Sequence, residues 1–263
     1  MGQAIAERIN TRYEVCVFEK DRAKTKGLIG ITVAADIGQL LKVSRVVILA
    51  IKPQDFDLVL EQIKGNLKDK LVISIAAGIT TDYIQKILGK ARVVRVMPNL
   101  AAKVGQSTTT ICKGAYAKAG DLKFAGALFE VLGAVFLLAE EMMDAATAIS
   151  GSGPAYIFYD MEIHRRDPLQ ISEEIKQEYI RQLKEAALAV GFDPQTAQDL
   201  AISTTVSSIS LAAQRLATPE QLRRMVTSPG GTTEAALQVI FAKGPWSEAA
   251  KAAKERAAQL AKK

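Results

Sequence analysis

The fold is decided by residues 46–76, VVILAIKPQDFDLVLEQIKGNLKDKLVISIA. Residues 46–51 and 71–76 consist almost entirely of valine, isoleucine, leucine and alanine, and residues 54–67 between them have helical periodicity. Segments that stay apolar at consecutive positions are typical of strands buried on both faces, as in a parallel sheet. A strand, a helix and a second such strand therefore predict an α/β fold with a parallel sheet.

The same alternation extends to both sides of this unit. We predict further strands at 12–18 and 91–96, weaker strands at 107–112 and 135–138, and a helix at 80–88. After about residue 140 the β-branched segments stop, and the rest of the chain has helical patterns. These predict helices at 139–159, 172–190, 194–216, 220–225, 232–241 and 247–260.

Glycine and proline residues separate the predicted helices, for example Pro194, Pro219 and the SPGG of residues 228–231. Because such residues interrupt helices, each later segment is expected to be a separate helix. The chain is therefore predicted to contain two domains, a dinucleotide-binding domain over residues 1–139 and an all-helical domain over residues 140–263.

Composition excludes several function classes. With 49% apolar residues among 263, the chain can bury a core. Its two cysteines, Cys16 and Cys112, have no metal-ligand spacing, which argues against a zinc site and favours a reducing compartment. The sequence has neither a signal-peptide pattern nor an apolar segment of membrane-spanning length, so we expect a cytoplasmic protein. A net charge of +6 without basic–aromatic alternation gives no indication of nucleic-acid binding.

The first residues are typical of the end of a dinucleotide-binding turn. Such folds begin with a strand, a glycine-rich turn and a helix. Here Gly2 is followed directly by a helical pattern, so we expect the first strand to be missing, through a late start site or a truncated coding sequence. The strand at 12–18 is followed by Lys20 and Arg22, which suit a 2′-phosphate and favour NADP, although NAD stays open.

Three predicted strands end in turns that suit a ligand. One turn contains Pro53, the next has small residues at 75–78, and the third ends in Pro98 and Asn99. Ligands of open α/β sheets bind at the carboxyl ends of the strands. Taken alone, each turn is more often a plain structural turn than part of a binding site. Three such turns at the same edge of the sheet favour a cofactor site.

A loop in the helical half is suited to bind a carboxylate. Residues 226–234, VTSPGGTTE, combine two glycines, four hydroxyl groups and the start of a helix. Free backbone amides and the positive end of a helix dipole attract anions. Residues 150–156, SGSGPAY, interrupt a helical pattern with small residues, which we interpret chiefly as a close helix crossing. The single histidine, His164, lies among charged residues and is expected at the surface.

The motifs LAIKPQ (49–54), SIAAG (74–78), VRVMPN (94–99), SGSGPAY and VTSPGGTT, in this order and spacing, resemble the Δ1-pyrroline-5-carboxylate reductase family. The resemblance covers nearly the whole chain. It implies a Rossmann-type half that binds NADPH or NADH and a helical dimerisation half that intertwines with a second subunit, with the substrate site at the dimer interface. Some members form rings of dimers. The implied reaction reduces Δ1-pyrroline-5-carboxylate to L-proline by hydride transfer to the imine carbon and needs no histidine base.

The resemblance also implies roles for single residues. Thr233 would be the catalytic residue that hydrogen-bonds the ring nitrogen. The substrate-binding set is Thr227, Ser228, Gly230, Gly231, Thr232 and Thr233. Together with Gly2, Lys20 and Arg22, the predicted cofactor-binding set contains Ala50, Ile51, Lys52, Pro53, Ile75, Ala76, Ala77 and Asn99.

The chain departs from the family at three further places, one of which is Ile37, where the family has an asparagine near the cofactor. About twenty residues, 160–179, look inserted or replaced, and within them Pro168 and Ser172 are predicted to end one helix and cap the next. Arg224 stands where the family usually has an acidic residue.

Two alternatives stay open. One is a truncated, weakly active or inactive homologue that acts only as a helical dimer. The other is a related imine or β-hydroxyacid oxidoreductase. The β-hydroxyacid dehydrogenases generally place a lysine in the first helix of their second domain, and residues 140–159 contain none, which argues against them.

Overall fold

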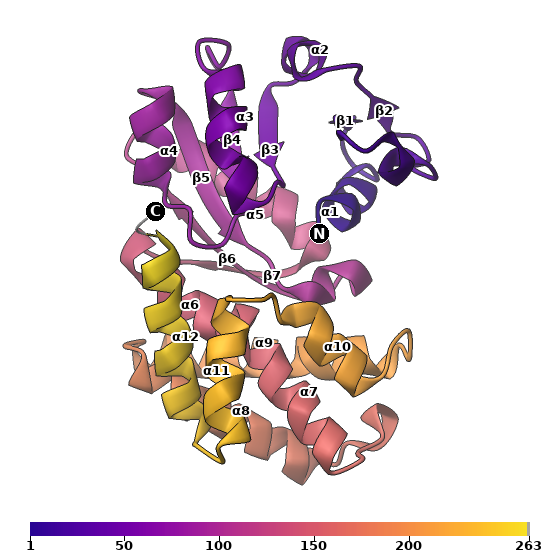
Figure 1. The fold of residues 1–263 in the computed structure, drawn as a ribbon, viewed down its shortest axis with the longest axis vertical. Coiled ribbons are helices and arrows are strands. Elements are labelled where there is room, and N and C mark those ends of the chain that lie inside the picture. The colour runs from indigo at the N-terminus through magenta and orange to yellow at the C-terminus, as the bar shows by residue number, and fades with distance from the viewer. Residues whose placement is uncertain (262–263) are drawn as a thin grey trace.

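The computed structural model describes residues 1–261, apart from the side chain of Pro53. Residues 262 and 263 of the predicted helical domain lie outside the described residues. An α/β half and an all-helical half are stacked along the long axis of the molecule (Figure 1). The predicted fold class, a Rossmann-type α/β half followed by helices, is thus confirmed.

The α/β half contains seven strands, which are β1 (Cys16–Val17), β2 (Thr32–Val33), β3 (Val46–Leu49), β4 (Leu71–Ser74), β5 (Arg92–Met97), β6 (Ser107–Lys113) and β7 (Gly133–Leu137). Its α-helices are α1 (Gly2–Ile9), α2 (Ile37–Val43), α3 (Phe56–Ile63), α4 (Thr81–Leu88) and α5 (Ala119–Phe129). Strands β3 to β7 form one sheet in chain order, while β1 and β2 form a separate parallel pair.

One strand runs against the expected direction. Strands β3, β4 and β5 are parallel, but β6 pairs antiparallel with β5. A parallel crossover needs a connection of a dozen or more residues. Only a short 3-10 helix, Leu100–Val104, lies between β5 and β6, so the chain must reverse. The sheet is therefore mostly, but not wholly, parallel.

The predicted strand at 12–18 was too long. The amides of Arg12 and Tyr13 bond back to the carbonyl of Ile9 and complete the end of α1. The strand that pairs with β2 is limited to Cys16–Val17, and the amides of Thr32 and Ala34 donate to the carbonyls of Val15 and Val17 at its two ends.

The helical half contains α6 (Met143–Ala146), α7 (Gly153–Ile163), α8 (Glu173–Ala189), α9 (Pro194–Ala213), α10 (Pro219–Val226), α11 (Thr232–Phe241) and α12 (Trp246–Ala261). The expected single helix at 139–159 is broken by a 3-10 turn, Glu140–Met142, and by a π-helix, Thr147–Gly151. Ser172 caps α8 as predicted, since its hydroxyl accepts a hydrogen bond from the amide of Ile175. Within residues 1–261, no helix has the length and apolarity that crossing a bilayer requires.

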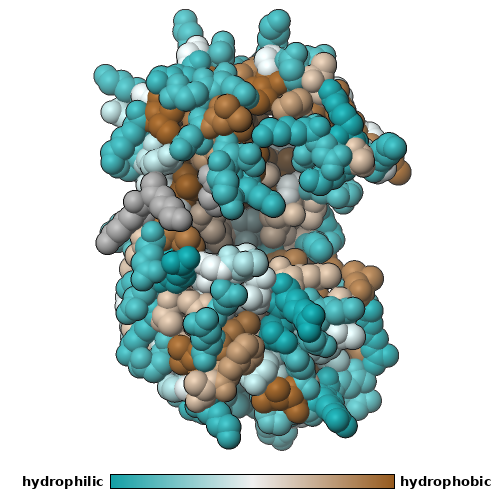
Figure 2. All heavy atoms as spheres, viewed as in Figure 1, coloured by the Kyte–Doolittle hydropathy of each residue, from teal (hydrophilic) through white to brown (hydrophobic). Residues whose placement is uncertain are grey.

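The halves have separate cores that meet at the sheet. The largest core lies among the helices, where Tyr156 packs edge-to-face on Trp246 and Tyr179 stacks on the same ring. Two smaller cores cover the two faces of the sheet. In the space-filling view the surface is hollowed between the halves (Figure 2).

Candidate active site

Three strand ends meet at one edge of the sheet. The register places Leu49 beside Ser74 and Ser74 beside Arg95, so β3, β4 and β5 run side by side in one direction. The segments that follow β3 and β4, residues 50–53 and 75–78, therefore emerge together, and we call them the strand-end edge. Pro53 begins a 3-10 turn, Pro53–Asp55.

The start of α1 lies against this edge. A Cβ atom added to Gly2 would stand 3.0 Å from the Cβ atom of Ala50, so a larger residue at position 2 would displace one of the two segments. The first amides of α1 have no partner within the helix, which makes this end the positive end of the helix dipole. The predicted residues Gly2 and Ala50 are thus neighbours.

The two basic residues after β1 have different surroundings. The Nζ of Lys20 lies 3.2 Å from a carboxylate oxygen of Asp55, next to the strand-end edge, and both side chains are exposed. Such a surface pair is weak, so the ammonium can change partners. The guanidinium of Arg22 instead donates to the carbonyl oxygens of Ala34 and Ala35 at 3.0 and 2.9 Å. Arg22 therefore holds the chain after β2 in place.

Asn99 is buried, and its amide group has two partners. Its Oδ1 accepts from the amide of Ala101 at 3.1 Å, and its Nδ2 donates to the hydroxyl of Ser207 on α9 at 3.3 Å. The side chain thus connects the end of β5 with the helical half.

The loop between α10 and α11 lies on the side of the helical half that faces the sheet (Figure 1). Gly230 has φ +68, a left-handed conformation that favours glycine. Its amide donates to a carboxylate oxygen of Glu234 at 2.8 Å, and the amide of Gly231 donates to the carbonyl of Ser228 at 3.0 Å. Thr227 closes α10, since its hydroxyl donates to the carbonyl of Arg223. Residues 227–233 contain the substrate-binding set that the sequence resemblance predicts, and we call them the substrate loop for that prediction.

Three hydroxyl groups meet where this loop enters α11. The hydroxyl of Thr233 donates to the Oγ of Ser152 at 3.1 Å, and Ser152 lies 3.0 Å from the Oγ1 of Thr232. Ser152 follows the π-helix directly, and irregular turns of this kind are frequent at functional sites. The sequence pattern was interpreted chiefly as a close helix crossing, and Ser152 was not among the predicted site residues. A serine between two glycines at an interrupted helix was the available signal.

Helix α12 contacts both regions. The Nε of Arg256 donates to the carbonyl of Gly230 at 2.6 Å. One turn further, the Cβ of Leu260 lies 3.2 Å from where a Cβ of Gly78 would stand. The last helix therefore connects the substrate loop with the strand-end edge.

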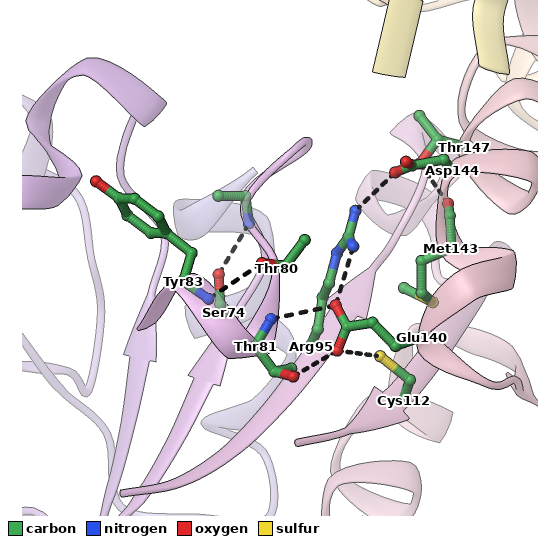
Figure 3. Close-up of polar contacts among 11 residues, drawn as sticks. Ser74, Thr80, Thr81, Tyr83, Arg95, Cys112, Glu140, Met143, Asp144 and Thr147 are labelled. Atoms are coloured by element: carbon green, nitrogen blue, oxygen red, sulfur yellow. Dashed lines mark hydrogen bonds and ion pairs between the residues drawn. The ribbon is translucent and has the colours of Figure 1, made fainter. Parts of the chain in front are cut away.

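A buried ion-pair network joins the halves beside the edge (Figure 3). Arg95 on β5 has a side chain that is 1% exposed and pairs with Glu140 at 3.1 Å and Asp144 at 3.4 Å. Glu140 also accepts from the amide and hydroxyl of Thr81 and from the thiol of Cys112. Burial, reinforced by the charge of Glu140, raises the pKa of Cys112 to about 12. None of these residues was predicted as functional.

Residues 160–179 become the end of α7, a connection and the first part of α8. Asp160 accepts from Arg166 at 2.8 Å and from the hydroxyl of Tyr179 at 2.5 Å, which ties the two helices together. Burial and the neighbouring carboxylate raise the pKa of Tyr179. His164 lies on the outside of this cluster with a side chain that is 52% exposed.

Arg224 is exposed and pairs with Glu220 on its own helix. Its neighbour Arg223 is the more enclosed of the two and binds both carboxylate oxygens of Glu162 on α7, at 2.7 and 3.1 Å. The departure from the family pattern at Arg224 thus lies on the surface.

Two family profiles match the chain. One, described as NADP oxidoreductase coenzyme F420-dependent, matches residues 1–78. The other, described as pyrroline-5-carboxylate reductase dimerisation, matches residues 177–263.

Pyrroline-5-carboxylate reductases of several organisms are similar to this chain. A pyrroline-5-carboxylate reductase of Synechocystis is 34% identical over 100% of this chain and 94% of its own length. Pyrroline-5-carboxylate reductase 2 of Bacillus subtilis is 38% identical over 74% of this chain and 64% of its own length. A solved pyrroline-5-carboxylate reductase of Coxiella burnetii, 31% identical, superposes with a TM-score of 0.64 over 100% of this chain and 95% of that one.

Proposed function

The chain belongs to the pyrroline-5-carboxylate reductase family, and we propose that it reduces Δ1-pyrroline-5-carboxylate to L-proline with NADPH or NADH. The substrate is a five-membered cyclic imine with a carboxylate, and protonation makes its imine carbon an acceptor for hydride. A nicotinamide dinucleotide supplies that hydride when it is bound. The protein's own task is to bind and orient the imine and to match its charges.

We assign the dinucleotide to residues 1–139 and the substrate to residues 140–263. The strand-end edge fits a dinucleotide because it combines two adjacent strand ends with small side chains at Ala50, Ala76 and Ala77. It also lies beside strand β5 and the positive end of α1. Ile51, Lys52, Pro53, Ile75 and Asn99 complete the predicted set. Lys20 is better placed than Arg22 to bind a 2′-phosphate, because its exposed partner Asp55 is easily exchanged.

The observation that carries the substrate assignment is the contact between Thr233 and Ser152, which joins the two glycine-containing motifs of the helical half. The amides at the start of α11 and the hydroxyls of residues 227–232 would hold the carboxylate. Thr233 would then face the ring nitrogen.

Turnover tests this proposal directly. Purified protein given pyrroline-5-carboxylate should oxidise NADPH, and Thr233→Ala should lower kcat at least about tenfold, since one hydrogen bond to a charged group is removed. NADPH binding by calorimetry should stay unchanged in this variant. An unaltered rate would remove Thr233 from its role, and a folded wild-type protein without turnover would contradict the proposed reaction.

We further propose a cytoplasmic homodimer, with rings of dimers as the larger assembly. The match of residues 177–263 to a dimerisation profile supports the dimer. So does helix α9, where Ile202 and Val206, one turn apart, are 40% and 38% exposed. The two free thiols suit a reducing compartment. Light scattering of the wild-type protein should give a multiple of the chain mass. The measured mass should be lower in Ile202→Glu, and an unchanged mass in this variant would exclude this face of α9 from the interface.

A further inference from the structure

Ser152 places a buried hydroxyl between the two threonines that begin α11. Its side chain is 0% exposed, and Thr233 is 4% exposed. The three oxygens form a chain, Thr233 to Ser152 at 3.1 Å and Ser152 to Thr232 at 3.0 Å. Residues 152 and 233 are 81 positions apart, so the contact depends on the packing of α7 against α11.

The hydrogen of Thr233 points to Ser152. Each hydroxyl carries one hydrogen and can accept two hydrogen bonds. Thr233 donates its hydrogen to Ser152, and in the second bond either Ser152 or Thr232 can be the donor. The oxygen of Thr233 consequently keeps free lone pairs and offers a substrate an acceptor.

We propose that Ser152 is a positioning residue that fixes the Thr233 hydroxyl as a hydrogen-bond acceptor, so that the site selects the protonated imine over the neutral one. This inference rests on the proposed function. A protonated imine presents an N–H group to the acceptor, whereas a neutral imine presents a lone pair. When the lone pair of a neutral imine faces the Thr233 oxygen, neither of these two acceptors has a hydrogen-bond donor. A site closed to water strongly disfavours that arrangement.

The selected form is also the reactive one. Hydride adds to the imine carbon, the π electrons of the C=N bond move to nitrogen, and the resulting neutral amine retains its N–H. That N–H still points to the Thr233 oxygen, so no hydrogen of the serine–threonine chain has to move during the transfer. The charged side chains that contact the loop, Glu234 and Arg256, bond Gly230 and leave this role to the hydroxyls.

The test compares two ring carboxylates as inhibitors of the intact enzyme. L-Proline has a ring N–H donor, and cyclopentanecarboxylate has a CH₂ group at that position. In Ser152→Ala the Thr233 hydroxyl loses its acceptor and can turn its hydrogen toward the ring. We expect the ratio of the two inhibition constants to shift about tenfold against proline, while the binding of cyclopentanecarboxylate and NADPH is unchanged.

Ser150→Ala is the matched control. Ser150 is equally buried and lies in the same irregular segment, but its hydroxyl donates to the carbonyl of Ala146. Its removal should leave the ratio unaltered. If Ser152→Ala does not fold, Ser152→Cys keeps the side-chain volume, and the same shift is expected.

An equal loss of affinity for both inhibitors would identify a merely structural role for Ser152 and overturn the inference, as would an unchanged ratio. Failure of the proposed function gives a different result. In that case the wild-type protein neither turns over pyrroline-5-carboxylate nor binds proline.

Discussion

Arg256 and Gly230 are joined by a hydrogen bond of 2.6 Å from the guanidinium Nε to the carbonyl oxygen, across 26 positions of sequence. The bond fixes the left-handed turn of the substrate loop from the side of α12. It also places a cation beside the amides that we assign to the substrate carboxylate. Hydrogen bonds from charged donors are roughly twice as strong as neutral ones.

Replacing this arginine should weaken substrate binding. In Arg256→Met the aliphatic part of the side chain remains, but the charge and the bond to Gly230 are lost. We expect the KM for pyrroline-5-carboxylate to rise about tenfold, which corresponds to about 1.4 kcal/mol. The Kd for NADPH should not change. Arg181→Met, which changes an exposed arginine of α8, is the control, and a KM equal to that of the control would contradict the role of Arg256.

Glu234 accepts from an amide of the loop that we assign to the substrate carboxylate. Its carboxylate already accepts from the amide of Gly230 and carries a negative charge near the predicted carboxylate site. Glu234→Gln keeps an acceptor oxygen and removes the charge, so KM should fall about threefold, and the difference should shrink at high salt. Glu248→Gln, which alters an exposed pair with Lys251, should have no such effect. A KM that rises in Glu234→Gln would show that the charge supports the loop instead.

The network around Arg95 should contribute to stability. In Glu140→Gln the buried guanidinium loses one of its two charged partners within residues 1–261 and keeps Asp144. Breaking a buried pair usually costs about 3–5 kcal/mol, and we expect about 2 kcal/mol because Glu140 is 27% exposed and Asp144 remains. Urea unfolding measures the change. Glu61→Gln, which affects the exposed pair with Lys64, should stay within about 0.5 kcal/mol. A similar loss in both variants would argue against a special role for Arg95.

Cys112 should make stability fall in alkaline solution. Its pKa is raised from 9.0 to about 12 in the folded protein, so between these values the unfolded chain loses the thiol proton and the folded chain keeps it. The unfolded state then binds fewer protons, and the free energy of unfolding decreases by about 1.4 kcal/mol per pH unit. The contribution of the thiol is complete below pH 9 and is lost as the pH rises toward 12. Unfolding curves at several pH values should show a steeper decline for wild type than for Cys112→Ala, and parallel curves would disprove the assignment.

The sequence predicted those features that are repeated in local patterns. The apolar segments before Ala50 and Ile75 became adjacent parallel strands, and the prolines at 194 and 219 begin helices. Continuous apolar segments and prolines determine structure through local geometry, and they can therefore be recognised in a short stretch of sequence.

Contacts between residues that are distant in the sequence produce no such local pattern and were not predicted. The reversal of β6 follows from the length of the connection after Asn99, and the partners of Ser152 and Arg95 lie 81 and 45 positions away. Arg22 carries the charge that suits a phosphate, yet its guanidinium is bonded to two backbone carbonyls. Which partner a side chain takes depends on packing that no periodicity encodes.

The π-helix at Thr147–Gly151 takes up one residue more than a regular helical turn. Successive residues of an α-helix are rotated by about 100° around its axis, and the wider π turn lets the extra residue fit without rotating the residues that follow. Deleting a single residue here would restore a regular α turn, and the residues after it would keep nearly the same rotational phase. Deleting a residue of α7 ahead of Tyr156 would instead rotate the remainder of that helix by this angle, and its core-facing side would turn toward other neighbours. The irregular segment can therefore absorb a one-residue change in length that the regular helix beside it cannot.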